Sequence, residues 1–256
     1  MRHSCTTLAF SLTLAASGLA RAQVNTEPLR DKIHEKGLSG ILQGTLDGHT
    51  GNTQGVTADG LLGGGIAHGR HLAFAFASAD YARLNGALGV DKSFAHVRYV
   101  YEIERWLWWE ALAQAQSDVF QRIRIRNLLG TGPRVALLRD DQFNLYLGVT
   151  YLLENDVTTF APGQTGEWEP FTQRVSGYLA EHTKLKDHVT TVATVYVQPA
   201  VTDASNVRVT VEAGFLFAVS KWLSTSIAFT GHYDSRPPPG VLPADTDLKN
   251  AIAFIW

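Results

Sequence analysis

The chain has 256 residues, with 22 Lys and Arg against 24 Asp and Glu, one cysteine and a formal net charge of −2. A mildly acidic chain without a basic stripe argues against nucleic-acid binding, and a single cysteine excludes an internal disulfide framework. Beyond the N-terminal leader there is no apolar run of about 18 residues, which excludes a transmembrane helix.

The first 22 residues have the three parts of a secretory signal peptide. Arg2 gives the basic start, an apolar stretch follows, and Ala20-Arg21-Ala22 forms an A-x-A cleavage site. We expect cleavage after Ala22, so that residues 1–22 are removed. Cys5 is then lost, which leaves no thiolate for catalysis or metal binding. The loss of two arginines moves the formal charge from −2 to −4.

From Gly37 onward, apolar and polar residues alternate over long segments. In the segment 207–219, mostly apolar residues lie on one face, opposite Arg208, Thr210 and Glu212. A period of two held over this length predicts a strand longer than the typical five or six residues, and a tilted membrane strand needs about nine to eleven. The same period occurs in 95–103, 144–154, 188–198 and 223–233.

About twelve such segments follow one another, and the connections between them alternate in length. Tight turns are expected at Gly69-Arg70, Glu104-Arg105, Asp140-Asp141, Lys184–Asp187 and Lys221-Trp222. Longer polar loops are expected over 155–172 and 236–247, although the connection near 117–121 is short. Short periplasmic turns and longer outer loops are typical of transmembrane barrels. The sequence therefore predicts an all-β, antiparallel up-and-down transmembrane barrel of about 12 strands over 37–256, after a short periplasmic segment over 23–36.

The chain ends on an aromatic strand. Ile252, Phe254 and Trp256 alternate with small or polar residues and would share one face. We expect this face to meet lipid, with Phe254 and Trp256 as a membrane-assembly signal. Four other tryptophans, Trp106, Trp108, Trp109 and Trp222, lie at two of the expected short turns. They fit either an aromatic girdle at the periplasmic rim or ordinary core aromatics.

Six stretches carry a resemblance to one known family. They are GHTGNT (48–53), WWEALAQAQ (108–116), RIRNLLGTGPR (124–134), GVTYLLE (148–154), VYVQP (195–199) and HYDSRPPPG (232–240). Together they resemble the salt-induced outer-membrane proteins, filed as domain of unknown function 481. The resemblance implies a Gram-negative outer-membrane barrel linked to envelope stress, with no established catalytic residues. Its implied partners are the bilayer, lipopolysaccharide and the barrel-assembly machinery, which recognises the Phe254-x-Trp256 ending; the oligomeric state stays open.

Two groups of residues have the types needed for hydrolytic chemistry in a membrane barrel. They are His232, Asp234 and Ser235 at the end of one strand, and Asp47, His49 and Asn52 near the first loop. A nucleophile needs a base within hydrogen-bond reach and a third group that orients the base. Closeness in sequence does not provide this geometry, because neighbouring strand residues point to opposite faces. The alternative is that these residues form a hydrogen-bond network at the rim of the loops, without a catalytic role.

The sequence predicts no cofactor and no metal. Its histidines occur singly, without the spacing of zinc motifs. Asp245 and Asp247 could hold a hard cation or belong to a solvated loop. The GLLGGG stretch (60–65) lacks a following helix, so its glycines indicate close packing or a bend and not nucleotide binding.

The inward rows carry charges of alternating sign. Glu110 lies on the fifth strand, Arg122, Arg124, Arg126 and Arg134 on the sixth, Glu154 on the seventh and Arg174 on the eighth. Neighbouring strands lie about 4.8 Å apart, so that opposite charges can pair, with Glu154 and Arg174 as the best pair. A charge in a narrow lumen costs several kcal/mol unless it is paired. Such pairs favour a narrow or filled interior over a wide pore.

Three functions fit these observations. The first is an envelope-related barrel that acts as a narrow or plugged pore for small solutes. The second is a lipid-modifying enzyme of the phospholipase or acyltransferase type, with a site near His232. The third is a soluble exported β protein, in which the apolar rows would form a dry core between sheets.

Overall fold

The structure, a computed structural model, describes residues 33, 37–50, 54–159, 167–168, 171–186 and 188–255. The side chains of Asp47, His49, Glu167, Trp168 and Ile255 are not described. The signal peptide, all of 23–36 except Ile33, Asn52 and Trp256 therefore lie outside the described residues. Within the described part, no helix is long and apolar enough to cross a membrane.

The described chain is almost entirely β-strand. The strands are β1 (Leu38–His49), β2 (Gly55–His68), β3 (His71–Leu84), β4 (Ala87–Glu104), β5 (Leu107–Asp118), β6 (Ile123–Arg139), β7 (Phe143–Thr159), β8 (Glu167–Trp168), β9 (Phe171–Lys186), β10 (Val189–Pro199), β11 (Val207–Ala218), β12 (Leu223–Asp234) and β13 (Ala244–Ile255). β8 has only two residues and pairs with the end of β7, so it belongs to a connection.

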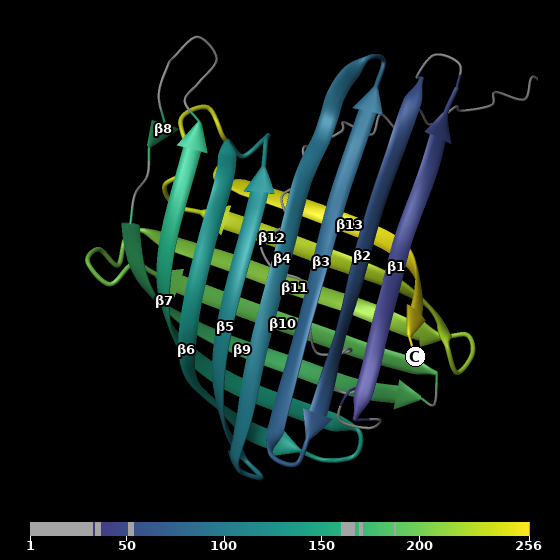
Figure 1. Cartoon of the computed structure of the whole chain (residues 1–256), viewed down its shortest axis with the longest axis vertical. Coiled ribbons are helices and arrows are strands. Elements are labelled where there is room, and N and C mark those ends of the chain that lie inside the picture. Colours follow the sequence, from purple (N-terminus) through teal and green to yellow (C-terminus); the bar gives the residue numbers. More distant parts are fainter. Residues whose placement is uncertain are drawn as a thin grey trace, which may run out of the picture.

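The other twelve strands close into one antiparallel barrel. Each pairs with its neighbours in chain order, β7 pairs with β9, and β1 pairs with β13 to close the ring. Figure 1 shows β1 to β7 on the near side and β9 to β13 crossing behind them. The expected all-β, up-and-down barrel of 12 strands is confirmed.

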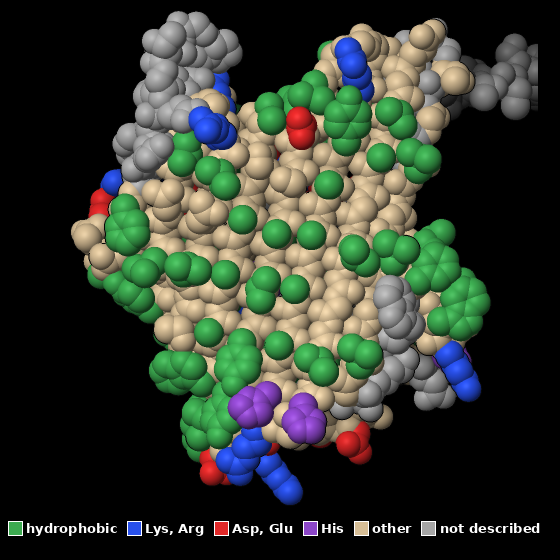
Figure 2. All heavy atoms as spheres, in the orientation of Figure 1, with side chains coloured by type: hydrophobic (Ala, Val, Ile, Leu, Met, Phe, Trp, Pro, Cys, Tyr) green, Lys and Arg blue, Asp and Glu red, His purple; other side chains and the backbone are tan. Residues whose placement is uncertain are grey.

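Side chains alternate between an exposed outer face and a buried inner face. On β4, His96, Arg98 and Val100 are buried, whereas Val97 and Tyr99 are about half exposed. Figure 2 shows hydrophobic side chains spread over the middle of the outer face and charged side chains gathered at its two ends. Charged groups inside and apolar groups outside are the reverse of a soluble protein. The alternative of a soluble protein with a dry inter-sheet core is therefore wrong.

The connections follow the expected alternation only in part. β2 and β3 join through Gly69-Arg70, as expected, but β3 and β4 also join tightly through Asn85 and Gly86, both with positive φ (51° and 79°). Two positive φ values mark a type I′ hairpin turn. The longer loops are shorter than expected, because β7 continues to Thr159 and β13 begins at Ala244.

The last strand has the expected facing. Ile252 and Phe254 are exposed, Ala251 and Ala253 are buried, and the Phe254 ring stacks on Trp222 at 5.7 Å between centroids. Of the other tryptophans, Trp106 and Trp109 are exposed, as a girdle requires. Trp108 is 6% exposed and packs inside the barrel, because it occupies an inward position of β5.

Glycines allow strands to pack closely at two places. A Cβ atom at Gly65 would lie 2.4 Å from Ile33 Cδ1, and one at Gly63 would lie 2.7 Å from Phe76 Cβ. The glycine run of β2 therefore leaves room for Ile33 and an aromatic side chain, in line with the close packing expected from the sequence.

We expect Gly132→Ala to destabilise the barrel. A Cβ atom at Gly132 would lie 1.9 Å from the Val149 carbonyl oxygen of β7, so β6 and β7 would have to move apart. Overpacking of this kind costs about 1–3 kcal/mol, measured here by urea unfolding of protein in lipid vesicles. Gly177→Ala on β9 is the control, because nothing lies within 4 Å of its Cβ position. Equal loss in both variants would contradict the close approach of β6 and β7.

Candidate functional site

Paired charges close one end of the barrel lumen. This mouth cluster consists of Arg126, Glu154, Asp156, Arg174, Arg208 and Asp234, from five strands. Arg126 binds Asp156 through two nearly parallel hydrogen bonds, Nε to Oδ1 at 2.7 Å and Nη2 to Oδ2 at 2.6 Å. Two-point contacts of this kind are the strongest arginine–carboxylate arrangement.

Arg174 is held on several sides at once. Its Nε lies 3.2 Å from Glu154 Oε2, while Nη1 donates to the backbone oxygens of Gln198 and Asn206 at 3.0 and 3.1 Å. Arg174 and Glu154 are each 2% exposed. A buried arginine needs this many acceptors, because its hydration has been removed.

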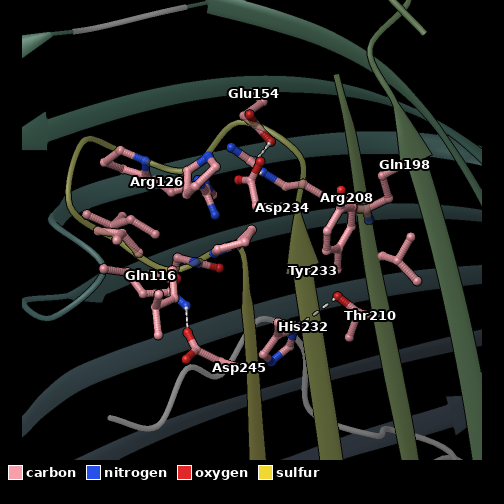
Figure 3. A pocket seen from close by; sticks show the side chains of 18 of the residues that line it. Gln116, Arg126, Glu154, Gln198, Arg208, Thr210, His232, Tyr233, Asp234 and Asp245 are labelled. Atoms are coloured by element: carbon pink, nitrogen blue, oxygen red, sulfur yellow. Dashed lines mark hydrogen bonds and ion pairs between the residues drawn. The ribbon is translucent and has the colours of Figure 1, made fainter. Parts of the chain in front are cut away.

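Arg208 ties strands that are not neighbours. It lies on β11, yet its Nη1 is 2.5 Å from Glu154 Oε2 and its Nη2 is 3.0 Å from Asp156 Oδ2, both on β7. Its Nε is 2.8 Å from Asp234 Oδ2 on β12. Figure 3 shows Arg208, Glu154 and Asp234 pointing toward one another at the mouth. β9 and β10 separate β7 from β11 along the sheet, so Arg208 reaches across the interior.

A second layer of polar and aromatic side chains fills the middle of the lumen. Glu110 on β5 lies 3.3 Å from Arg98 Nη1 and accepts a 2.7 Å hydrogen bond from the Tyr178 hydroxyl on β9. The Arg134 guanidinium lies 4.0 Å from the centroid of the Tyr146 ring. Tyr196 packs against Tyr178 at 5.3 Å. The Tyr178–Glu110 hydrogen bond joins strands that are not neighbours, β9 and β5, whereas the other three contacts lie between adjacent strands.

Apolar side chains fill the part of the lumen near the first turns. The buried members are Ile33, Leu61, Leu72, Phe74, Phe76, Phe94, Val100 and Trp108. Ile33 precedes β1 and is fully buried, and its carbonyl oxygen accepts a 2.8 Å hydrogen bond from Gly37 N. A residue from outside the barrel wall thus takes part in the apolar plug. This packing is not apparent from the sequence, because Leu72, Phe74 and Phe76 look like lipid-facing residues.

A separate group of charges lies behind the junction of β1 and β13. Lys249 Nζ on β13 lies 3.0 Å from Asp80 Oδ1 and 3.6 Å from Asp59 Oδ1. Lys92 Nζ lies 3.6 Å from the other oxygen of Asp80. Asp247 is 3.9 Å from Lys249 Nζ. We call these five residues the seam cluster.

Small cavities lie between these layers, and two of them adjoin. The larger, of about 60 Å³, lies at the mouth beneath the β12–β13 loop and is lined by Gln116, Thr210 and His232 among others. The smaller, of about 20 Å³, lies next to Arg98, Tyr178 and Tyr196. Gln114, Leu128 and Gln198 line both cavities. The two spaces therefore follow one another along the lumen.

The structure brings together some of the predicted lumen pairs and rearranges others. Glu154 and Arg174 lie together, whereas Glu110 pairs with Arg98 on β4 and not with an arginine of β6. Arg126 binds Asp156 instead.

Two of the other β6 arginines do not face the lumen as expected. Arg124 is exposed, because a register shift between Ile123 and Ile125 interrupts the alternation there. Arg122 lies in the β5–β6 turn, where its Nη1 donates to the Pro239 carbonyl oxygen of the β12–β13 loop. Arg98 and Arg208 were not among the predicted lumen residues. Both occupy inward positions of clearly alternating strands, and this alternation could have indicated that they face the lumen.

The candidate catalytic residues do not assemble into a relay. His232 Nδ1 lies 3.2 Å from Thr210 Oγ1, and Asp234 binds Arg208. The Ser235 hydroxyl donates to the Ser205 carbonyl oxygen at 2.9 Å and accepts from Val207 N at 2.8 Å. The geometry gives no support to the lipid-modifying enzyme.

The structure also gives no support to the second catalytic group or to the cation site. Asp47 and His49 lie on β1 with undescribed side chains, and Asn52 is outside the described residues. Asp245 and Asp247 lie on β13, not in a loop, with Gln121 and Lys249 as respective partners. No group of metal-ligating residues occurs in the part of the chain that the structure describes.

Comparison with known proteins identifies the family. The model of the family described as "Protein of unknown function, DUF481" matches residues 45–256. The chain belongs to the DUF481 family. No curated protein matches it.

Solved structures show the same architecture as this DUF481 barrel. The translocator domain of the autotransporter NalP from Neisseria meningitidis is similar at 12% identity and a TM-score of 0.54, over 90% of this chain and 92% of that one. The NanC porin has 11% identity, a TM-score of 0.48 and coverages of 85% and 97%. The KdgM porin has 10% identity, a TM-score of 0.48 and coverages of 85% and 98%. At 12% identity, the likeness to the NalP translocator domain shows the fold alone, which is a β-barrel.

We expect Arg208→Met to destabilise the barrel strongly. The variant leaves Glu154, Asp156 and Asp234 with fewer cationic partners in a buried place, and breaking a buried ion pair costs about 3–5 kcal/mol. The measurement is the urea midpoint in vesicles. Arg236→Met is the matched control, because its pair with Asp203 is about half exposed, and such surface pairs contribute about 0–1 kcal/mol. A similar midpoint shift in both variants would show that the mouth cluster is hydrated.

Proposed function

We propose that this protein is an outer-membrane channel for small solutes with a narrow and largely filled lumen. The observation that carries the proposal is Arg208, which reaches across the interior to two carboxylates of β7. In a wide aqueous pore these charges would keep their own hydration and would need no partner across the lumen. Paired charges at the mouth, a filled middle layer and an apolar plug make three successive barriers.

The arrangement of cavities supports a narrow path over a purely structural barrel. The two spaces share Gln114, Leu128 and Gln198 as lining residues and continue from the mouth to the middle layer. Amide and hydroxyl groups along this path offer hydrogen bonds to a small polar solute. The mouth cluster contains three arginines and three carboxylates, so its formal charge is zero. A neutral or zwitterionic solute suits such a path better than an ion.

Small solutes should cross this barrel slowly and by size. We expect proteoliposomes to admit glycerol faster than sucrose, and planar bilayers to show small or no steady conductance. Thr210→Trp, which fills the mouth cavity, should slow the glycerol influx. Val195→Trp is the control, because Val195 points outward from the neighbouring strand β10 and is 39% exposed.

The outcomes separate three alternatives. Large steady channels and equal rates for glycerol and sucrose would show an open pore. Glycerol influx no faster than in empty liposomes would show that the barrel is not a channel. Both tryptophan variants should have urea midpoints close to that of the parent protein. This control would show that the effect on flux is local.

We further propose a location and an orientation. Cleavage after Ala22 would release the mature chain to the periplasm, and an even number of strands returns both ends to that side. The connection between β7 and β9 then lies on the cell surface and the β9–β10 turn in the periplasm. Barrel assembly through the C-terminal strand, contact with lipopolysaccharide and a link to envelope stress are parts of the same proposal.

Protease treatment of intact cells tests this orientation. We expect cleavage between β7 and β9, and protection of the β9–β10 turn until the outer membrane is opened. The mature protein should begin at Gln23 and fractionate with outer membranes. Cleavage at the β9–β10 turn in intact cells would require the inverted orientation.

A further inference from the structure

The barrel is closed over only part of the junction between β1 and β13. Their register runs from Ile41 opposite Ile255 to Gly44 opposite Ile252 and then stops. The rest of β1 pairs only with β2, through His49, and the rest of β13 pairs only with β12, from Ala244. Every other junction in the barrel is paired over a longer stretch. In Figure 1, β1 rises steeply from this point, away from β13.

The two separated strand segments, 45–49 and 247–251, form what we call the open seam. Their edges carry backbone N–H and C=O groups that do not meet across the junction. In hydrocarbon each unsatisfied group costs several kcal/mol, and open edges occur only where they line water or protein. An uncovered seam in hydrocarbon would therefore be costly, and a polar group that reaches its edges would lower that cost.

The side chains on the two faces of the open seam differ in polarity. On the outer face, Leu46 and Leu248 are 76% and 68% exposed. On the inner face, Lys249 reaches past β1 to Asp59 and Asp80. Continuation of the register would place Lys249 opposite Asp47 on β1, but its described partners lie on β2 and β3. An apolar outer rim with paired charges directly behind it suits a molecule that is itself amphiphilic.

We propose that the open seam is a lateral access site for a zwitterionic amphiphile of the surrounding bilayer. The acyl chain stays outside against Leu46 and Leu248, and the head group enters the lumen beside Lys249 and Asp59. A zwitterion can exchange with an existing ion pair without leaving a charge unpaired, which an anionic or neutral head group cannot do. This inference rests on the proposed membrane location but not on solute conduction.

Cysteine cross-linking measures the separation of the two strands directly. The test pair is Leu46→Cys with Asn250→Cys, which would face each other if the register continued. The control pair is Leu42→Cys with Phe254→Cys, which are opposite in the structure. The two pairs are four residues apart on each strand, so they share one face and one type of strand pairing. Both are made with Cys5→Ser.

We expect the control pair to oxidise to completion in phosphatidylcholine nanodiscs and the test pair to stay reduced. A disulfide needs Cα atoms about 4.4–6.8 Å apart, which paired strands provide and separated strands do not. Cross-linking of the test pair to the extent of the control would show a closed junction and overturn the proposal. Cross-links between two copies at residue 46 would show that another barrel covers the edge, which overturns it too.

A photoactivatable phosphatidylcholine with a diazirine in its head group tests the occupant. We expect labelled peptides to include the inward residues Thr45 and Lys249, with weaker labelling by a phosphatidylglycerol probe of the same design. Inward residues of the fully paired strand β10, such as Thr194, serve as the internal control. Equal labelling of Thr194, equal labelling by both probes or labelling of outward residues alone would overturn the proposal. None of these outcomes depends on conductance, so failure here is distinct from failure of the channel proposal.

Discussion

The cost of removing charges from water organises the interior of this barrel. Inside the twelve strands, the arginines and carboxylates of the mouth cluster are mostly buried, and each is held by oppositely charged partners on the wall. Arg126 on β6 binds Asp156 on the next strand, β7, whereas Arg208 on β11 reaches β7 past β10 and β9. Pairing of this kind fastens the walls to one another, and the same contacts that stabilise the barrel also obstruct it.

The barriers along the lumen differ in chemical character, which bears on how such a channel could open. The mouth cluster and the middle layer consist of charges and hydrogen-bonding rings, whose partners a polar solute can replace. The plug around Ile33 is apolar and offers no such exchange. Ile33 precedes β1, but the other seven buried residues of the plug lie on β2 to β5, so most of the plug belongs to the barrel wall itself.

The junction between the first and last strands is the weakest part of the ring. Among the described residues, the register from Ile41 to Gly44 joins β1 to β13, while Lys249 makes side-chain contacts further along. Backbone hydrogen bonds thus hold one part of the junction, and ion pairs lie behind the other part. In a membrane this division matters, because an ion pair can exchange partners with a head group whereas a hydrogen-bonded ladder must be broken first.

The period of two determined the fold from the sequence alone. Strands such as 95–103 and 207–219 alternate so regularly that barrel class, strand number and most turns could be predicted, as could the nearness of Glu154 and Arg174. These are local or nearest-neighbour properties, fixed by side-chain alternation and by the order of strands along the chain.

Tertiary structure alone decided what crosses the lumen. Arg208 meets Glu154 only because β11 curves round to face β7, and no sequence spacing reports that distance. The facing of β3 also needed the structure, since its large residues Leu72, Phe74 and Phe76 point inward while alanines point outward. Hydrophobicity by itself cannot tell a lipid-facing row from an apolar plug, because both remove the same side chains from water.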